Sequence, residues 1–161
     1  MTEEERHSEF QQLMDASRHT VVRICRAYYR YDSEEFRDLY QEVICTLWEV
    51  YQNFRGECQW NTLVYRVAFN VAEDDRLASR RRPILIGDIG SLRETTLLEE
   101  DPVVVRLYEL IDRLESGDKV LMIMYLEQMR QGDIAEVLGI KESAVNKRIE
   151  RIKKKLRNMN Q

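Results

Sequence analysis

The sequence predicts an all-α protein, made of two small helical domains that an acidic linker joins. Apolar residues recur at helical spacing along most of the 161 residues, charged residues make up 34% of the chain, and only 2 prolines and 6 glycines interrupt it. This composition favours long solvated helices over a sheet. The hydrophobic content of 43% is enough for two modest cores.

The first predicted domain, residues 1–83, contains three amphipathic helices. Apolar stripes at spacings of three, four and seven run through residues 10–28, 36–51 and 60–71, and each stripe marks one buried helix face. We expect the three helices to pack together as a small bundle.

Local signals set the ends of these helices. Asp32 and Glu35 have the spacing of a capping box for the second helix. Gly56 separates the second helix from the third. Pro83 disfavours helix in the residue before it, so the third helix is expected to end there.

Residues 84–102 are predicted to be a linker, because they hold two glycines, show little periodicity and end in acidic residues. The second domain, residues 103–161, is expected to open with a helix over Val104–Leu114 that Ser116 and Gly117 end. A short apolar helix over Val120–Met129 follows in this prediction.

The stretch GDIAEVLGIKESAVNKRIERIKKKL, residues 132–156, has the spacing of a helix-turn-helix. Gly139 can adopt the left-handed conformation that ends a helix. The second helix would bury Val145, Ile149 and Ile152 and leave a polar face in solvent. On that face, Asn146 suits adenine, and Lys147 and Arg151 suit guanine or phosphate.

Charge distribution also favours a nucleic-acid partner. Although the whole chain carries a net charge of -4, residues 119–161 hold 10 basic and 5 acidic side chains, and a basic end suggests a polyanion. The alternative is a solvated basic helix that packs a core and binds nothing.

Other functional classes are less compatible with the sequence. It has no phosphate-binding loop, nucleophile elbow or metal-ligand spacing, so we expect no enzyme activity, metal or cofactor. Its three cysteines are widely spaced, which favours free thiols. The acidic first residues and the lack of a long apolar run predict a cytoplasmic protein without membrane insertion.

The chain resembles bacterial sigma-70 family RNA polymerase sigma factors. The resemblance lies in the stretch DLYQEVICTLWEVYQNFRGECQWNTLVYRVAFNVAEDDRLASRRRP and in the acidic linker and the helix-turn-helix that follow it. The resemblance covers about residues 10–157 and is greatest to the compact, two-domain extracytoplasmic-function group. It implies a transcription-initiation factor in which residues 1–83 are region 2 and residues 103–161 are region 4.

The resemblance also implies DNA-binding roles. The loop and helix start after Phe54 would capture an unpaired base of the minus-ten promoter element, and the following helix would track the melted strand. The residues implied in minus-ten binding are Arg55, Gln59, Asn61, Tyr65, Arg66, Asn70, Arg76, Arg80, Arg81 and Arg82. Trp60 is expected to be core instead. Region 4 would read the minus-thirty-five element through Ser143, Asn146, Lys147 and Arg151.

Protein partners follow from the same resemblance. Asp38, Gln41, Glu42 and Trp48 match the helix that docks on the clamp coiled coil of the largest subunit of core RNA polymerase. Region 4 would rest on the polymerase flap, and the linker would pass toward the RNA exit path. Many relatives are held by an anti-sigma factor, so such a partner is an open expectation here.

The sequence departs from the family at two helix caps, and one alternative function stays open. Arg130 and Lys141 stand where the family often has a Ser or Thr helix cap, which predicts a loss on the order of 1 kcal/mol at each position. The alternative function is a stand-alone helix-turn-helix regulator that binds an operator without polymerase.

Overall fold

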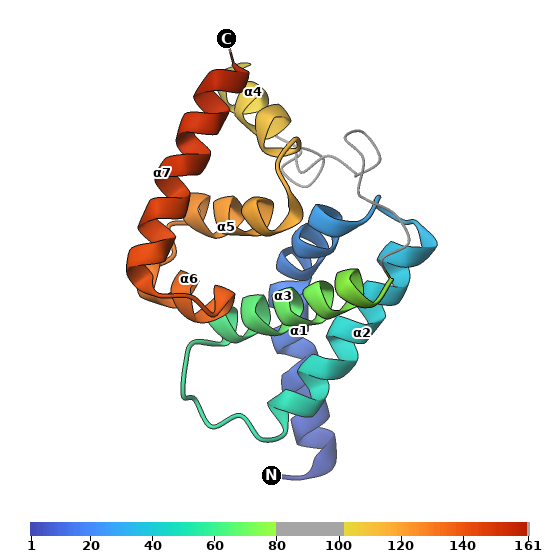
Figure 1. Ribbon diagram of the computed structural model, residues 1–161. Helices are drawn as coiled ribbons and strands as arrows, with labels where there is room; N and C mark the ends of the chain where they lie inside the picture. Colours follow the sequence, from blue (N-terminus) through green and yellow to red (C-terminus); the bar gives the residue numbers. More distant parts are fainter. Residues whose placement is uncertain (80–101, 161) are drawn as a thin grey trace.

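The computed structural model describes residues 1–79 and 102–160, which form seven α-helices and no strand (Figure 1). The all-α prediction is confirmed for these residues. The Arg80–Arg82 cluster, Pro83 and residues 84–101 of the predicted linker lie outside the described residues. The predicted division into two domains therefore stays a prediction at its boundary.

The N-terminal half is a bundle of three helices: α1 (Glu3–Tyr28), α2 (Glu34–Tyr51) and α3 (Trp60–Ser79). Each of the three packs against the other two. The predicted apolar stripes form the buried faces, since α2 buries Phe36, Leu39, Val43 and Leu47 in steps of three and four.

The start of α2 corrects the predicted capping box. Ser33 is the N-cap, and its hydroxyl accepts a hydrogen bond from the backbone N–H of Phe36 at 3.1 Å. Asp32 instead takes a positive φ of 61° in the turn before the helix. A capping box is present in α1, where Thr2 and Glu5 bond reciprocally at 2.9 and 3.1 Å.

The C-terminal half consists of α4 (Pro102–Ile111), α5 (Ser116–Leu126), α6 (Gln131–Leu138) and α7 (Glu142–Met159). The last helix, α7, packs against each of the other three, and it runs along one side of the molecule in Figure 1.

Ser116 and Gly117 begin α5 rather than ending the helix before it. Helix α4 ends at Ile111, and short turns carry the chain onward, with the Leu114 N–H bonding the Ile111 carbonyl at 3.0 Å. The extended backbone of Glu115 then acts as the N-cap of α5. Asp118 in the first turn suits the positive end of the helix dipole.

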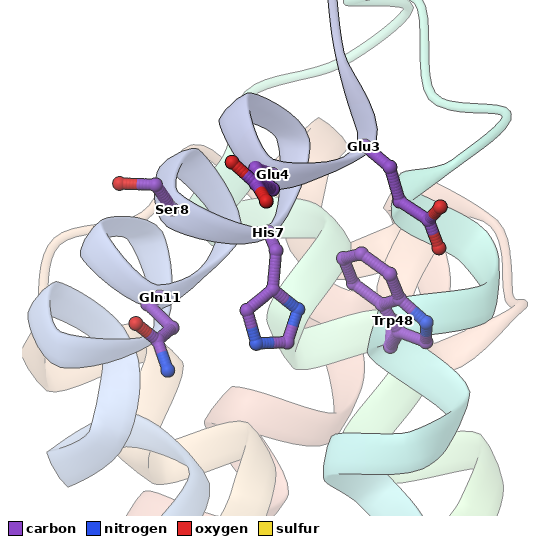
Figure 2. A pocket seen from close by; sticks show the side chains of 6 residues that line it. All are labelled: Glu3, Glu4, His7, Ser8, Gln11 and Trp48. Carbon is purple, nitrogen blue, oxygen red and sulfur yellow. The ribbon is translucent and has the colours of Figure 1, made fainter.

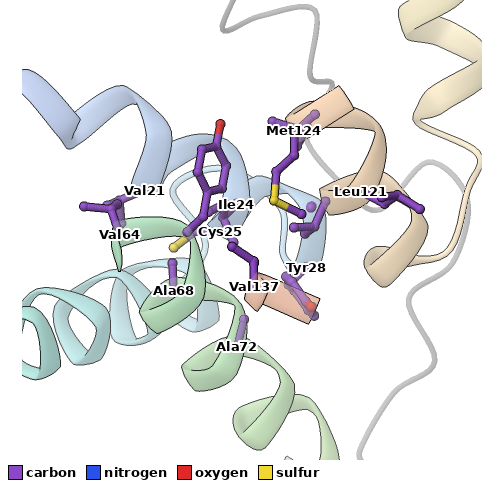
Figure 3. Close-up of a cluster of buried hydrophobic side chains, with 14 of the residues drawn as sticks. Val21, Ile24, Cys25, Tyr28, Val64, Ala68, Ala72, Leu121, Met124 and Val137 are labelled. Atoms are coloured by element: carbon purple, nitrogen blue, oxygen red, sulfur yellow. The ribbon is translucent and has the colours of Figure 1, made fainter. Parts of the chain in front are cut away.

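The two halves share one continuous core. Helix α6 packs on α3, and α5 packs on α1. Leu121, Met124 and Val137 from the C-terminal half belong to the same buried cluster as Tyr28 and Ala72 from the N-terminal half (Figure 3). Because this burial removes apolar surface from water, it holds the halves together.

Candidate nucleic-acid interface

The helix-turn-helix forms as the sequence predicts. Gly139 follows α6 with φ 70° and ψ 32°, the left-handed conformation that glycine adopts without steric cost. The N–H of Ile140 then bonds the carbonyl of Ala135 at 3.1 Å, which closes the end of α6. Helix α7 starts two residues later and packs on α6.

The two faces of α7 differ sharply in character. Its inner face buries Val145, Ile149, Ile152 and Leu156. Its outer face exposes the four predicted base-reading residues, which are Ser143, Asn146, Lys147 and Arg151. At 3.6 residues per turn these four project from one side of the helix, as a major-groove reading face requires.

Basic residues at the flanks of this face have separate roles. Arg148 is half-buried and pairs with Asp118 at 2.8 Å, which ties α7 to the start of α5. The Lys153 ammonium lies 4.9 Å from the centroid of the Tyr125 ring, a cation–π contact. Lys154, Lys155 and Arg157 are exposed and extend the positive charge along α7.

Both predicted weak caps are confirmed. Arg130 and Lys141 occupy the N-cap positions of α6 and α7 with extended backbones, and neither side chain makes a capping hydrogen bond. Arg130 instead pairs with Asp133 at 3.1 Å.

The loop between α2 and α3 is held by its own residues and by an aromatic cluster. Gly56 has a φ of 79°, and the backbone N–H of Arg55 donates to Glu57 at 3.0 Å, which lowers the pKa of that carboxyl. Trp60 lies against Phe10, Tyr51 and Phe54, and its indole N–H donates to Ser17 at 3.0 Å.

Trp60 therefore anchors the loop, as expected of a core residue. Three of the predicted minus-ten residues beside it, Arg55, Gln59 and Asn61, are exposed. A pocket of about 450 Å³ adjoins the loop, and Phe54, Cys58, Arg66 and Glu136 are among its lining residues.

The predicted minus-ten residues on α3 differ in their surroundings. Asn70 is exposed. Tyr65 is fully buried, and its hydroxyl donates to Glu127 of the C-terminal half. Burial, followed by the nearby Glu127 carboxylate, raises the pKa of Tyr65.

The two arginines on α3 are bound by carboxylates. Arg66 donates to Glu136 of α6 at 2.7 Å. Arg76 donates through two nitrogens to Glu73, at 2.8 and 2.9 Å, and this bond raises the pKa of Arg76. Tyr65 and Arg66 thus both bind carboxylates of the other half of the chain.

Acidic residues near the end of α3 face α1. The Tyr28 hydroxyl donates to Glu73 at 2.7 Å, and the Tyr29 hydroxyl donates to Asp75. Burial and the Glu73 carboxylate raise the pKa of Tyr28. These two carboxylates are therefore engaged within the fold, while Asp74 is exposed.

The predicted polymerase-docking residues lie on one exposed side of α2. Asp38, Gln41 and Glu42 are exposed, and Trp48 is half-buried beside them. The Trp48 ring packs edge-on against His7 and Phe10 of α1, at 5.4 and 5.1 Å between centroids. Figure 2 shows Trp48 and His7 at a pocket of about 390 Å³ that Glu3 and Glu4 also line.

Sequence patterns missed three charged residues of the interface between the halves. Glu127 lies between Arg23 of α1 and Tyr65 of α3, and Glu136 lies against Arg66. Nothing in the local spacing singles out Arg23, Glu127 or Glu136, because each resembles the many other charged residues on or beside the helices.

Two features of the described residues bear on other functions. Their His, Cys, Asp and Glu side chains form no group that could hold a metal ion. Their helices include none that is both long and apolar enough to span a membrane.

Sequence similarity connects this chain to known proteins. The family described as "Sigma-70, region 4" matches residues 105–156, which span the helix-turn-helix. The RNA polymerase sigma-H factor of Pseudomonas aeruginosa is 26% identical over 136 residues, a match that covers 74% of this chain and 69% of that protein.

A solved structure shares the fold. CnrH, solved in complex with the cytosolic domain of CnrY, matches 95% of this chain and 88% of its own with a TM-score of 0.65 and 19% identity. Residues 105–156 thus match region 4 of sigma-70 factors, the chain is similar in sequence to an RNA polymerase sigma factor, and it has the fold of CnrH.

Proposed function

We propose that this chain is a sigma factor that binds core RNA polymerase and directs initiation at promoters with two separate DNA elements. The observation that carries this proposal is the helix-turn-helix, which matches region 4 and exposes Ser143, Asn146, Lys147 and Arg151 on one face of α7. In this proposal these four side chains read the minus-thirty-five element in the major groove.

The N-terminal half, residues 1–83, would take the minus-ten element. Its exposed loop carries Arg55, Gln59 and Asn61 beside an aromatic anchor, and polar groups of this kind suit capture of an unstacked base. Tyr65, Arg66, Asn70 and Arg76 continue along α3, and Arg80–Arg82 would add phosphate contacts whose strength falls with salt. Residues 84–102 would link this half to residues 103–161.

Docking on polymerase would use the exposed side of α2. Asp38 and Glu42 place negative charge beside the half-buried Trp48, a combination that suits a basic helical partner such as the clamp coiled coil. The C-terminal half would rest on the flap. CnrH was solved with the cytosolic domain of CnrY, and we propose that an anti-sigma factor likewise binds this chain in the cytoplasm.

Run-off transcription tests the proposal. Purified core polymerase is combined with the protein on a genomic promoter library, and specific new transcripts are expected only when both are present. Asn146→Ala combined with Lys147→Ala should abolish those transcripts while core binding persists. Asp38→Lys combined with Glu42→Lys should instead abolish core binding.

Asp15→Lys is the matched control for the docking variants, because Asp15 is an exposed acidic residue of α1. It should retain both core binding and transcription. Tight duplex binding by the protein alone, without core binding or transcripts, would overturn the proposal.

A further inference from the structure

The two halves of the chain touch through the helices that the proposed function assigns to different DNA elements. Helix α6, the first helix of the helix-turn-helix, packs on α3, along which the melted minus-ten strand would lie. Val137 of α6 enters the cluster that contains Ala68 and Ala72 of α3 (Figure 3). The described structure is therefore a closed form.

This closed form cannot bind both promoter elements at once. The centres of elements near positions minus ten and minus thirty-five are about 25 base pairs apart, or roughly 85 Å at 3.4 Å per base pair. Helices α3 and α6 are in direct contact, so reading both elements requires the halves to separate.

Two carboxylates occupy hydrogen-bond donors at the contact. Glu127 accepts from the Arg23 guanidinium and from the Tyr65 hydroxyl through its two different oxygens. Glu136 accepts from the Arg66 guanidinium at 2.7 Å. The side chains of Arg23 and Glu127 are only 21% and 26% exposed, so this part of the contact is shielded from solvent.

The donors that hold these carboxylates are of the kind that binds DNA phosphate. Guanidinium and hydroxyl groups are among the donors that proteins use to bind phosphate oxygens. Tyr65 and Arg66 belong to the proposed minus-ten surface, and Arg23 lies beside them on α1 and shares Glu127 with Tyr65. A carboxylate that fills such a site excludes a phosphate by charge and by space.

We infer that Glu127 and Glu136 act as internal substitutes for DNA phosphates, which together with the shared apolar core keep the chain closed and occupy Tyr65 and Arg66 of its minus-ten surface. When the halves separate, Arg23 joins Tyr65 and Arg66 in one phosphate-binding surface for the melted strand. This inference rests on the proposed function. The outer face of α7 is exposed in the closed form, so closure weakens single-strand binding at Tyr65 and Arg66 and leaves duplex binding by α7 intact.

The test uses the full chain with Glu127→Gln and Glu136→Gln combined. Small-angle X-ray scattering should show a larger radius of gyration than in the wild type. Affinity for a labelled single-stranded DNA of random sequence, about twelve nucleotides long, should rise about tenfold, since a mostly closed protein binds in proportion to its open fraction. Affinity for a random duplex should change less than twofold.

The control is the double variant Asp15→Asn with Glu35→Gln, which removes two exposed carboxylates outside the contact. It should match the wild type in both measurements. A second pair checks closure alone: Arg66→Glu should expand the chain, and adding Glu136→Arg should restore the compact form. Circular dichroism confirms that each variant keeps its helices.

Equal radii and equal single-strand affinities for the wild type and the Glu127/Glu136 variant would overturn the inference. Expansion without a gain in single-strand affinity would show that the two carboxylates help to close the chain but do not occupy phosphate-binding sites, and would overturn the phosphate-substitute role. Either result is compatible with promoter-specific transcription by the wild type. If the proposed function is wrong, that transcription would be absent whatever the scattering shows.

Discussion

The Arg148 guanidinium lies 2.8 Å from the Asp118 carboxylate, and this ion pair joins helix α7 to the first turn of α5. The Asp118 side chain is only 12% exposed, so the pair is poorly screened by water. Since α7 carries the proposed base-reading face, the pair also helps to fix the direction in which that face points. It links the packing of the C-terminal half to its proposed function.

Asp118→Asn should therefore destabilise the protein. The substitution removes the negative charge and leaves Arg148 without its partner, at an expected cost of about 1–3 kcal/mol in the free energy of unfolding. Urea unfolding measures this value. The control is Asp15→Asn, whose pair with Arg18 is 71% and 63% exposed and should contribute less than about 1 kcal/mol. Equal losses for the two variants would contradict the assigned role of Asp118.

Lys119 gives a second prediction, on pH. It is fully buried in α5, its ammonium makes no hydrogen bond within the described residues, and burial lowers the pKa of Lys119 from 10.5 to about 8, partly offset by Asp112. Between pH 8 and 10.5 the unfolded chain therefore holds more protons at this lysine than the folded chain does. The contribution of Lys119 to stability should rise with pH through this window, by up to about 3 kcal/mol.

Comparison with Lys119→Met isolates this contribution. Burial raises the pKa of Cys25 to about 12 and also raises that of Tyr28, so these groups lower stability as the pH rises above about 9. Both proteins share that loss. The stability of Lys119→Met should exceed that of the wild type near pH 7, and the gap should close toward pH 10. A gap that stays constant with pH would exclude titration of Lys119 as its cause.

Much of this fold could be predicted because local patterns determine it. The buried stripes of α2 and α7 recur in steps of three and four, and Gly139 ends α6 as predicted. Two predictions about helix ends were wrong, because neighbouring residues carry similar capping signals. Ser33 caps α2 in place of Asp32, one residue away, and Ser116 begins a helix instead of ending one.

The closed contact could not be predicted for a different reason. Arg23 and Glu127 are 104 positions apart in the chain, and Arg66 and Glu136 are 70 apart. Pairs at such separations leave no periodic trace in one sequence, since each charge alone resembles any solvated helix residue. The exposure of Ser143, Asn146, Lys147 and Arg151 on α7 could be predicted, because the buried inner face of the same helix determines which residues face outward.

The uncapped start of α7 gives a third prediction, on stability. Lys141 has the extended backbone of an N-cap, with φ -72° and ψ 149°, but makes no side-chain capping bond. Lys141→Ser would supply a hydroxyl acceptor for the first-turn N–H groups, and should raise the free energy of unfolding by about 1 kcal/mol. Thermal and urea unfolding measure the gain.

The matched control is Lys154→Ser, which makes the same charge change at an exposed position inside α7. Serine is a weaker helix former than lysine, so this variant should lose a few tenths of a kcal/mol. A gain in both variants would show that removal of positive charge, rather than capping, stabilises the helix.

The fourth prediction separates base contacts from phosphate contacts on α7. Asn146 and Lys147 are adjacent and both exposed, but an amide can pair with adenine whereas an ammonium acts chiefly as a charge. The selected duplex is the minus-thirty-five element of a promoter found by run-off transcription. Asn146→Ala should cost about 1–3 kcal/mol of affinity for this duplex and leave the salt dependence unchanged. Lys147→Ala should reduce the slope of log K against log salt by about 1 if its contact is to phosphate.

Each of these variants is the control for the other, because they change neighbouring positions of one helix. Titration of the selected duplex and of a random duplex, each at several salt concentrations, gives both quantities. Loss of affinity for the selected duplex alone identifies Asn146 as a base contact. An equal loss on both duplexes would instead place Asn146 on the phosphate backbone, and sequence reading would then have to rest on Ser143 and Arg151.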